Sequence, residues 1–385
     1  MKQSKGQRKK IIGLFPELLG VGGIQEAGRL TAAALGRIAR SHDNWVTSFQ
    51  SINDAPRAHE FEIAEQRVSL RGFNRSKLGF VASALGESRR DARVVLAGHP
   101  YLALPAAWMK WLSPQLKTIV MSHGVEVWNP LPRLRRRALL SADRVLAPSS
   151  DTAQKLAEVQ GVPPANIRKL AWPLNPDFLK MADNSAELSC PRNFPEGRVI
   201  LTVGRWAASE RYKGVDDLIR AVAQLQTNFP GLCLVAVGDG DDLPRLAKIA
   251  GDLGLSASVR FLTNLSHKEI AACYARSEIF ALPSTGEGFG LVFLEAMAFG
   301  KPLIGAARGG ITDIIEDKVN GLLVPAGDWQ SLVKALAELL ENESLRIELG
   351  RRGAQNVRHR YSFDVFVNDL ERIIEECGLD SAVPG

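Results

Sequence analysis

Cysteine is scarce in this sequence of 385 residues. Its four cysteines, Cys190, Cys233, Cys273 and Cys377, include no close pair, which excludes the zinc and redox motifs that need neighbouring thiolates. Cys233 and Cys273 stand in apolar surroundings, as is typical of small core residues. This usage fits a reducing compartment, and we expect a cytoplasmic protein.

Long hydrophobic runs are also lacking. The most apolar long stretch, residues 94–112, is interrupted by a histidine, two prolines and a lysine, so we expect no transmembrane helix. The basic N-terminus is followed by the apolar run 11–15, which is too short for the core of a signal peptide and ends at Pro16.

Acidic residues are outnumbered, and the net charge is +6. An excess of positive charge fits nucleic acid, an anionic membrane or an anionic substrate. The sequence has no aromatic-basic platform of the kind that nucleic-acid-binding proteins use, so we expect no nucleic-acid partner. The basic residues gather in two clusters. These are Lys2, Lys5, Arg8, Lys9 and Lys10, and Arg133, Arg135, Arg136 and Arg137. A solvated tail and helix face is the favoured interpretation, with peripheral membrane contact as the alternative.

The chain is too long for one ordinary core and reads as two α/β domains. Short apolar runs alternate with helical patterns, which predicts parallel sheets covered by helices on both faces. The runs are 11–15, 45–49, 94–97, 118–122 and 144–147, then 199–203, 232–237, 259–262, 279–282, 302–304 and 321–324. The proline-rich segment 172–197 reads as a linker. We therefore predict an N-terminal domain over 1–173 and a C-terminal domain over 174–362, with the helix in 363–385 packing on either.

The most informative motif follows the predicted strand 279–282. Gly286, Gly288 and Gly290 expose backbone N–H groups just before a helix predicted over about 291–299, and a helix N-terminus of this kind suits phosphate. Glu287 lies among these glycines, and Glu295 lies on the helix among apolar residues, where ligand hydroxyls would satisfy its carboxylate. The alternatives are an exposed loop acid for Glu287 and a surface position for Glu295.

A second motif follows the predicted strand 199–203. Arg205 stands at the strand end and Lys213 at the start of the next helix, so both cations can converge on one anion. Two positive charges suit a diphosphate leaving group. The alternative is that both are solvated loop cations.

Three weaker features follow other strands. The loop 20–23, with Gly22 and Gly23, lacks the dinucleotide fingerprint because Gln25 stands where the third glycine should be. His123 follows the strand 118–122, where either a general base or a hydrogen-bonded structural residue fits. The acidic run 239–242 fits loop and capping roles better than a metal site, and we expect no metal.

Together these residues resemble glycosyltransferase family 4, the retaining enzymes of GT-B fold. Glu287 and Glu295 match its paired-glutamate motif, and Gly204-Arg205 with Lys213-Gly214 match its diphosphate motif. The weaker matches are Gly20-Val21-Gly22-Gly23, His123-Gly124, Arg308-Gly309-Gly310 and the segment 320–325. The resemblance spans nearly the whole chain and implies two Rossmann-like domains facing a cleft.

The resemblance also implies roles for the matching residues. The implied catalytic set is His123, Glu287, Arg205 and Lys213. The implied donor contacts are Gly22, Gly23, Arg205, Lys213, Leu265, Glu287, Gly288, Phe289, Gly290, Leu291 and Glu295. Two departures stand out: Asp313 replaces a glutamate usual in the family, and the segment between Arg205 and Lys213 is slightly long and holds Trp206, Glu210 and Arg211.

The implied reaction moves a hexose-type sugar, with retention, from a nucleotide-diphosphate-sugar to a hydroxyl acceptor, without a cofactor. A saccharide or lipid-linked saccharide of cell-surface polysaccharide synthesis is the expected acceptor. The segment 107–112, with Trp108 and Trp111, fits either a packed helix or a membrane-docking element. The alternatives are a nucleotide-sugar epimerase on the same architecture and a non-catalytic subunit that binds the donor.

Overall fold

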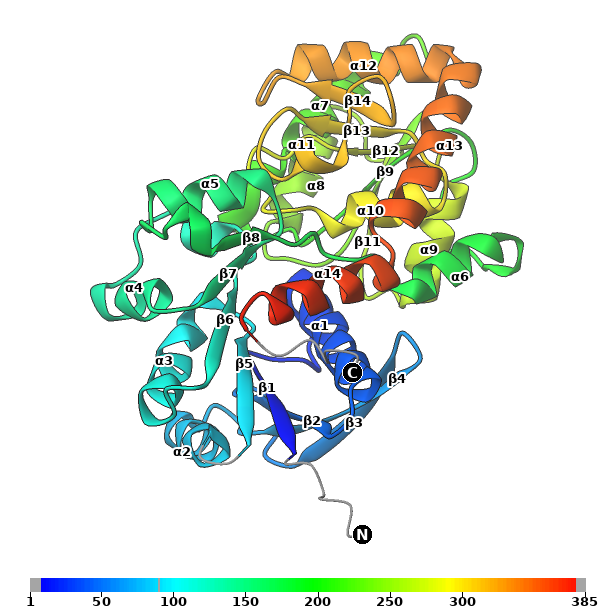
Figure 1. Ribbon diagram of the computed structural model, residues 1–385. Helices are drawn as coiled ribbons and strands as arrows, with labels where there is room; N and C mark the ends of the chain where they lie inside the picture. The colour runs from blue at the N-terminus through cyan, green and yellow to red at the C-terminus, as the bar shows by residue number, and fades with distance from the viewer. Residues whose placement is uncertain (1–7, 89–90, 379–385) are drawn as a thin grey trace. The chain divides into compact units, whose positions relative to one another are not determined.

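The computed structural model describes residues 8–88 and 91–378. The chain divides into two compact α/β units, whose helices and strands are labelled in Figure 1. Unit 1 comprises residues 1–175 and 362–385, and unit 2 comprises residues 176–361. In this division the boundary falls after Asn175, and the C-terminal helix α14 (Phe363–Glu375) groups with unit 1.

Unit 1 is built on an eight-stranded sheet in the order β3-β4-β2-β1-β5-β6-β7-β8. Its strands are β1 (Lys9–Phe15), β2 (Trp45–Ser51), β3 (Ala58–Ile63), β4 (Gln66–Gly72), β5 (Ala92–Ala97), β6 (Lys117–Met121), β7 (Arg144–Ala147) and β8 (Ile167–Lys169). All neighbouring pairs are parallel except β3 and β4, which form an antiparallel hairpin. The apolar runs predicted the five central strands but not β3, β4 and β8. Those three lie toward the edges of the sheet and have exposed or half-buried positions, so they lack the apolar run that marks a strand buried on both faces.

Helices cover both faces of this sheet. They are α1 (Gly23–Ser41), α2 (Lys77–Ser88), α3 (Ala103–Leu112), α4 (Arg133–Leu140), α5 (Ser150–Glu158) and α14. Helix α1 packs beside α14, as Figure 1 shows. On the other face, α2 to α5 share one core with alternating side chains of the central strands, such as Ile12, Val95 and Val120.

Unit 2 carries a six-stranded, wholly parallel sheet in the order β11-β10-β9-β12-β13-β14. The strands are β9 (Val199–Val203), β10 (Cys233–Val237), β11 (Val259–Leu262), β12 (Ile279–Leu282), β13 (Leu303–Ala306) and β14 (Gly321–Val324). Each overlaps a predicted run. The chain moves outward from β9 to β11 and then returns to the centre at β12. This is the doubly wound order of Rossmann folds, in which ligands bind where the strand order reverses, here between β9 and β12.

The helices of unit 2 are α6 (Pro176–Asp183), α7 (Val215–Leu225), α8 (Leu243–Asp252), α9 (His267–Arg276), α10 (Leu291–Ala298), α11 (Ile311–Ile314), α12 (Trp329–Glu341) and α13 (Glu343–Arg360). Helices α7, α8 and α12 share one core with Ile279 and Ala281 of β12. The intervening Phe280 faces the other side, where it packs against Tyr274 of α9 and Phe293 of α10. The α/β prediction with two Rossmann-like units is confirmed. Across residues 8–88 and 91–378, no helix is both long and apolar enough to cross a membrane.

Candidate active site

The loop after β9 brings the two predicted cations together. The side chains of Arg205 and Lys213 both pair with Glu210: Arg205 Nη2 bonds Oε1, and Lys213 Nζ lies 3.2 Å from Oε2. Lys213 and Glu210 are only 14% and 10% exposed, whereas Arg205 is 72% exposed. The Lys213 ammonium also lies over the ring of buried Trp206, 5.8 Å from its centroid. The two cations therefore converge around one carboxylate at the carboxyl end of β9.

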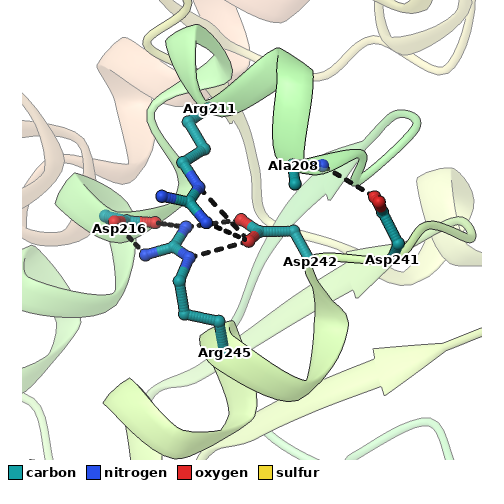
Figure 2. A network of polar contacts seen from close by, with 6 residues as sticks. All are labelled: Ala208, Arg211, Asp216, Asp241, Asp242 and Arg245. Carbon is teal, nitrogen blue, oxygen red and sulfur yellow. Dashed lines mark hydrogen bonds and ion pairs between the residues drawn. The ribbon is translucent and has the colours of Figure 1, made fainter.

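Polar contacts outside this pair of cations fix the backbone of the same loop. The 3-10 helix Ala208–Lys213 begins where Ala208 donates its backbone N–H to Asp241 Oδ1 at 2.7 Å. Figure 2 shows the neighbouring network, in which Asp242 accepts hydrogen bonds from both Arg211 and Arg245. Arg245 also forms a two-pronged contact with Asp216 of α7, at 2.6 and 2.8 Å.

The acidic run 239–242 thus anchors loops. Asp239 Oδ2 accepts the backbone N–H of Asn264 at 3.3 Å, while Asp241 and Asp242 hold the loop that carries Lys213. The expected loop role agrees with these contacts. The expected capping role is wrong for Asp242, because its side chain makes no capping hydrogen bond to α8 and is bound by arginines instead.

The loop after β12 packs directly on the loop after β9. Thr285 donates its backbone N–H to the carbonyl oxygen of Tyr212 at 2.8 Å. Gly214 has φ 74°, and a Cβ atom there would lie 2.8 Å from the carbonyl oxygen of Pro283. This position needs glycine for both its backbone conformation and its close contact. Lys213 and Glu287 are thereby held in neighbouring segments at the switch point of the sheet.

Glu287 combines burial with an unsatisfied oxygen. Its Oε1 is shut off from solvent and has no hydrogen-bond partner within the described part of the chain. Burial raises the pKa of Glu287, against the opposing effects of the Lys213 charge and a hydrogen bond with Ser284. A buried acceptor without a donor is costly, so a ligand hydroxyl that donated to Oε1 would remove a penalty.

A third loop, which follows β13, contacts the backbone of Glu287. Gly310 donates its backbone N–H to the Glu287 carbonyl oxygen at 2.8 Å. Gly309 has φ 66°, and a Cβ atom there would lie 2.6 Å from that oxygen. Helix α10 then starts after Gly290, whose φ of 105° is also in the left-handed region. Three glycine-containing loops, after β9, β12 and β13, therefore define this end of the sheet.

Glu295 lies on α10 and has a protein partner. Its Oε2 accepts a hydrogen bond from the hydroxyl of Tyr274 at 2.8 Å. Tyr274 is fully buried, and burial, followed by the Glu295 charge, raises its pKa well above the ordinary value, so the hydroxyl keeps its proton. Tyr274 thus supplies one of the hydrogen bonds to the Glu295 carboxylate that the sequence analysis expected from ligand hydroxyls. Nothing in the sequence indicated this pair.

The remaining predicted donor contacts of unit 2 lie along the same edge. Gly288 and Phe289 are buried in the loop before α10, and Phe289 packs edge-on against Tyr361 at 6.1 Å between ring centroids. Leu291 begins α10. Leu265 lies in the loop between β11 and α9, which follows the outermost strand on the β9 side.

Unit 1 carries the other predicted residues. His123 follows β6, and its Nε2 lies 2.8 Å from the Gly98 carbonyl oxygen, so this nitrogen carries a proton that it donates. The ring stacks on His99 and lies beside Trp172, at 5.7 and 5.4 Å between centroids. These contacts support a hydrogen-bonded structural role for His123, because its Nε2 is already bonded to the Gly98 carbonyl oxygen.

Gly22 and Gly23 are exposed at the start of α1, and Gly22 has φ 141°. Arg29 braces the loop before them by donating to the carbonyl oxygens of Leu18 and Gly20, at 2.7 and 2.8 Å. Asp54 accepts the Leu18 backbone N–H at 2.8 Å. These contacts fix the backbone up to Gly20, just before the exposed residues 21–23.

The architecture of unit 2, with its cation pair and half-buried glutamate at the switch point, is that of a Rossmann-like α/β unit. Together with the second Rossmann-like unit, it gives the GT-B class of glycosyltransferases. Within the described ranges, no three or more His, Cys, Asp or Glu side chains gather where they could hold a metal ion.

Comparison with known proteins gives the family. The chain belongs to the group 1 and family 4 glycosyltransferases: the family described as "Glycosyl transferases group 1" matches residues 190–356, and "Glycosyltransferase Family 4" matches residues 26–177. An alpha-D-kanosaminyltransferase of Streptomyces kanamyceticus is 30% identical over 80% of this chain and 81% of its own length. A D-inositol 3-phosphate glycosyltransferase of Mycobacterium bovis is 29% identical over 64% of this chain, and the match spans 54% of that relative. The protein is a glycosyltransferase.

Solved structures share the fold. Anabaena HepE in complex with UDP has a TM-score of 0.72 at 18% identity and covers 95% of this chain and 100% of its own. Sucrose-phosphate synthase of Thermosynechococcus elongatus has a TM-score of 0.73 at 20% identity and covers 96% and 99%.

Proposed function

We propose that this enzyme transfers a hexose-type sugar, with retention of configuration, from a nucleotide-diphosphate-sugar to a hydroxyl acceptor. The observation that carries the proposal is the convergence of Arg205 and Lys213 at the switch point of unit 2. Two cations at that place suit a diphosphate, because negative charge grows on the diphosphate as the sugar–phosphate bond breaks.

The chemistry follows from these groups. Arg205, Lys213 and the N-terminus of α10 stabilise the departing diphosphate, and this electrostatic contribution is the main catalytic one. Glu287 accepts hydrogen bonds from hydroxyls of the donor sugar through its buried oxygen, and Glu295 accepts hydrogen bonds from the ribose hydroxyls. In the retaining route, the acceptor oxygen attacks from the face that the diphosphate leaves, and the leaving phosphate oxygen takes the acceptor proton.

The residues of unit 1 serve the sugar and the acceptor in this proposal. His123 contacts the donor sugar from a ring fixed by Gly98 and Trp172. Gly22 and Gly23 expose backbone beside the substrates. Neither a metal ion nor a cofactor takes part in the proposed reaction.

The names of the structural neighbours guide the choice of substrates to test. Anabaena HepE is described in complexes with UDP and glucose, so UDP-sugars come first among donors. Another neighbour is a lipopolysaccharide outer core galactosyltransferase, which favours a saccharide or lipid-linked saccharide of the cell surface as acceptor. We place the reaction in the cytoplasm, with contact to the membrane face.

An apolar and basic surface on unit 1 supports that contact. Helices α3 and α4 pack on each other and expose Trp111 and Leu134, at 80% and 67%, together with Trp108. Four exposed arginines lie on α4, Arg133, Arg135, Arg136 and Arg137, and the helix has no acidic residue. Exposed aromatic and basic side chains on neighbouring helices suit the interface of an anionic bilayer.

Sedimentation with lipid vesicles tests this contact. Vesicles that contain phosphatidylglycerol should bind the wild type and bind Trp111→Ser more weakly, whereas Ile347→Ser, which changes an exposed apolar residue of α13, should bind like the wild type. Equal binding to pure phosphatidylcholine vesicles would refute the electrostatic part.

The experiment that tests the function is a donor screen. The purified protein is incubated with UDP-, GDP-, ADP- and dTDP-sugars and a saccharide acceptor, with and without EDTA, and nucleoside diphosphate release is followed. The proposal predicts release from one donor that survives EDTA, with an α-configured product from an α-configured donor. An isomerised donor without release would indicate an epimerase, and binding without turnover across acceptors would indicate a non-catalytic subunit.

A further inference from the structure

Glu210 occupies the centre of the proposed diphosphate site. Its two carboxylate oxygens contact the two cations separately, Arg205 through Oε1 and Lys213 through Oε2. Burial alone would raise the pKa of Glu210, but the hydrogen bond from Arg205 and the charge of Lys213 lower it overall, so the carboxylate is ionised at neutral pH. An internal anion therefore neutralises the pair that the proposed function assigns to the donor.

We propose that Glu210 is a built-in competitor of the donor's diphosphate: its carboxylate pairs with both Arg205 and Lys213 and must yield them when the diphosphate binds. This inference rests on the proposed function. It assigns Glu210 a positioning role with a measurable cost in affinity, and release of the nucleoside diphosphate product is helped by its return to the cations.

The surroundings allow this exchange without unfolding the loop. The loop is fixed independently of Glu210, by the hydrogen bond from the Ala208 backbone N–H to Asp241 and by the contact of the Arg211 side chain with Asp242. Lys213 keeps a second support from the Trp206 ring when its contact with Glu210 is lost. Arg205 is mostly exposed, so its guanidinium can turn from Glu210 to a phosphate with little loss of packing.

A purely structural Glu210 would behave differently. If its two contacts only held the loop, removing them would loosen Arg205 and Lys213 and weaken anion binding. If Glu210 competes, removing its charge leaves two cations without an internal partner and strengthens anion binding. The sign of the change in affinity distinguishes the two roles, because Coulomb interactions at these short distances are sizeable even near a protein surface.

The test is a titration of UDP, GDP, ADP and dTDP into the wild type, Glu210→Gln, Glu210→Ala and Lys213→Ala by isothermal calorimetry. Asp241→Asn is the matched control, because it removes one negative charge beside the same loop, at an exposed residue that accepts the Ala208 backbone N–H. We expect Glu210→Gln and Glu210→Ala to bind the preferred nucleotide about tenfold more tightly than the wild type. Asp241→Asn should bind no more tightly than the wild type.

The outcomes distinguish a failure of the competitor role of Glu210 from a failure of the proposed diphosphate site. Weaker or unchanged binding in both Glu210 variants, with Lys213→Ala also weakened, would overturn the competitor role and leave the diphosphate site standing. Equal binding by the wild type and Lys213→Ala would overturn the diphosphate site itself. Loss of folding in both Glu210 variants would also overturn the inference, since Glu210 would then hold the fold.

Discussion

The backbone N–H of Thr285 donates to the carbonyl oxygen of Tyr212 at 2.8 Å. This bond joins the loop after β12 to the loop after β9 across the switch point of unit 2. Lys213 follows directly after Tyr212, and Glu287 comes shortly after Thr285. Main-chain contacts, rather than their own side chains, thus place Lys213 and Glu287 in adjoining loops, as the proposed diphosphate and sugar contacts require.

We expect the ionised side chain of Glu287 to destabilise the folded protein. Its pKa is raised chiefly by burial, so the folded state penalises the ionised form, and stability is lost as pH rises through that raised pKa. Glu287→Gln removes the charge, and we expect a gain of roughly 0.5–2 kcal/mol in unfolding free energy at neutral pH. The gain should shrink as pH falls and the wild-type carboxyl becomes protonated. Denaturant unfolding at several pH values measures it.

The same variant should lose activity. A carboxylate that accepts a sugar hydroxyl is worth roughly a tenfold to hundredfold effect on turnover. Glu341→Gln, at an exposed position of α12, serves as the control and should change neither property. A Glu287→Gln enzyme that is less stable at neutral pH would contradict the account of its burial.

Gly309 should matter for the position of the Glu287 loop as well as for its own backbone. Gly309→Ala places a Cβ atom 2.6 Å from the Glu287 carbonyl oxygen at φ 66°, whereas Gly327→Ala has a similar φ of 78° and nothing within 4 Å. Both should lose about 1 kcal/mol of stability from left-handed backbone. Only Gly309→Ala should lower kcat, by about tenfold or more, because small displacements of reacting groups are costly. Equal kinetics in the two variants would show that the contact is not needed.

His99 should make unit 1 sensitive to acid. Burial, with contributions from His123 and Arg135, lowers the pKa of His99 to about 4, against the opposing effect of Glu126. The unfolded chain therefore takes up the proton first, and stability falls as pH drops from the unfolded pKa toward the folded one. We expect the wild type to lose about 2–3 kcal/mol from this group between pH 7 and about pH 4.5. His99→Gln should show a smaller acid loss in unfolding experiments, and an unchanged loss would assign the acid sensitivity elsewhere.

The sequence predicted the sheets where strands are buried on both faces. Most strands of unit 2 and several central strands of unit 1 are short, largely apolar runs, as is typical of strands in a parallel sheet covered by helices. The hairpin of β3 and β4 was not predicted, because only alternate side chains of these strands are buried and their sequences therefore resemble a polar loop.

The sequence singled out candidate site residues one by one, but it did not show the network that joins them. Motif spacing placed Arg205, Lys213 and Glu287 after the correct strands. It could not show that Glu210 lies between the two cations, because that contact depends on how a 3-10 helix folds back. The hydrogen bond between Tyr274 and Glu295 was equally hidden, since it depends on how the successive helices α9 and α10 pack against each other.

The most direct test of the central claim is the turnover of Lys213→Ala with the preferred nucleotide-sugar. Removing one cation that stabilises the departing diphosphate should lower kcat by about a hundredfold or more, with the fold intact by circular dichroism. Lys248→Ala, at an exposed lysine of α8, should turn over like the wild type. Near wild-type turnover in Lys213→Ala would contradict the diphosphate role and the mechanism built on it.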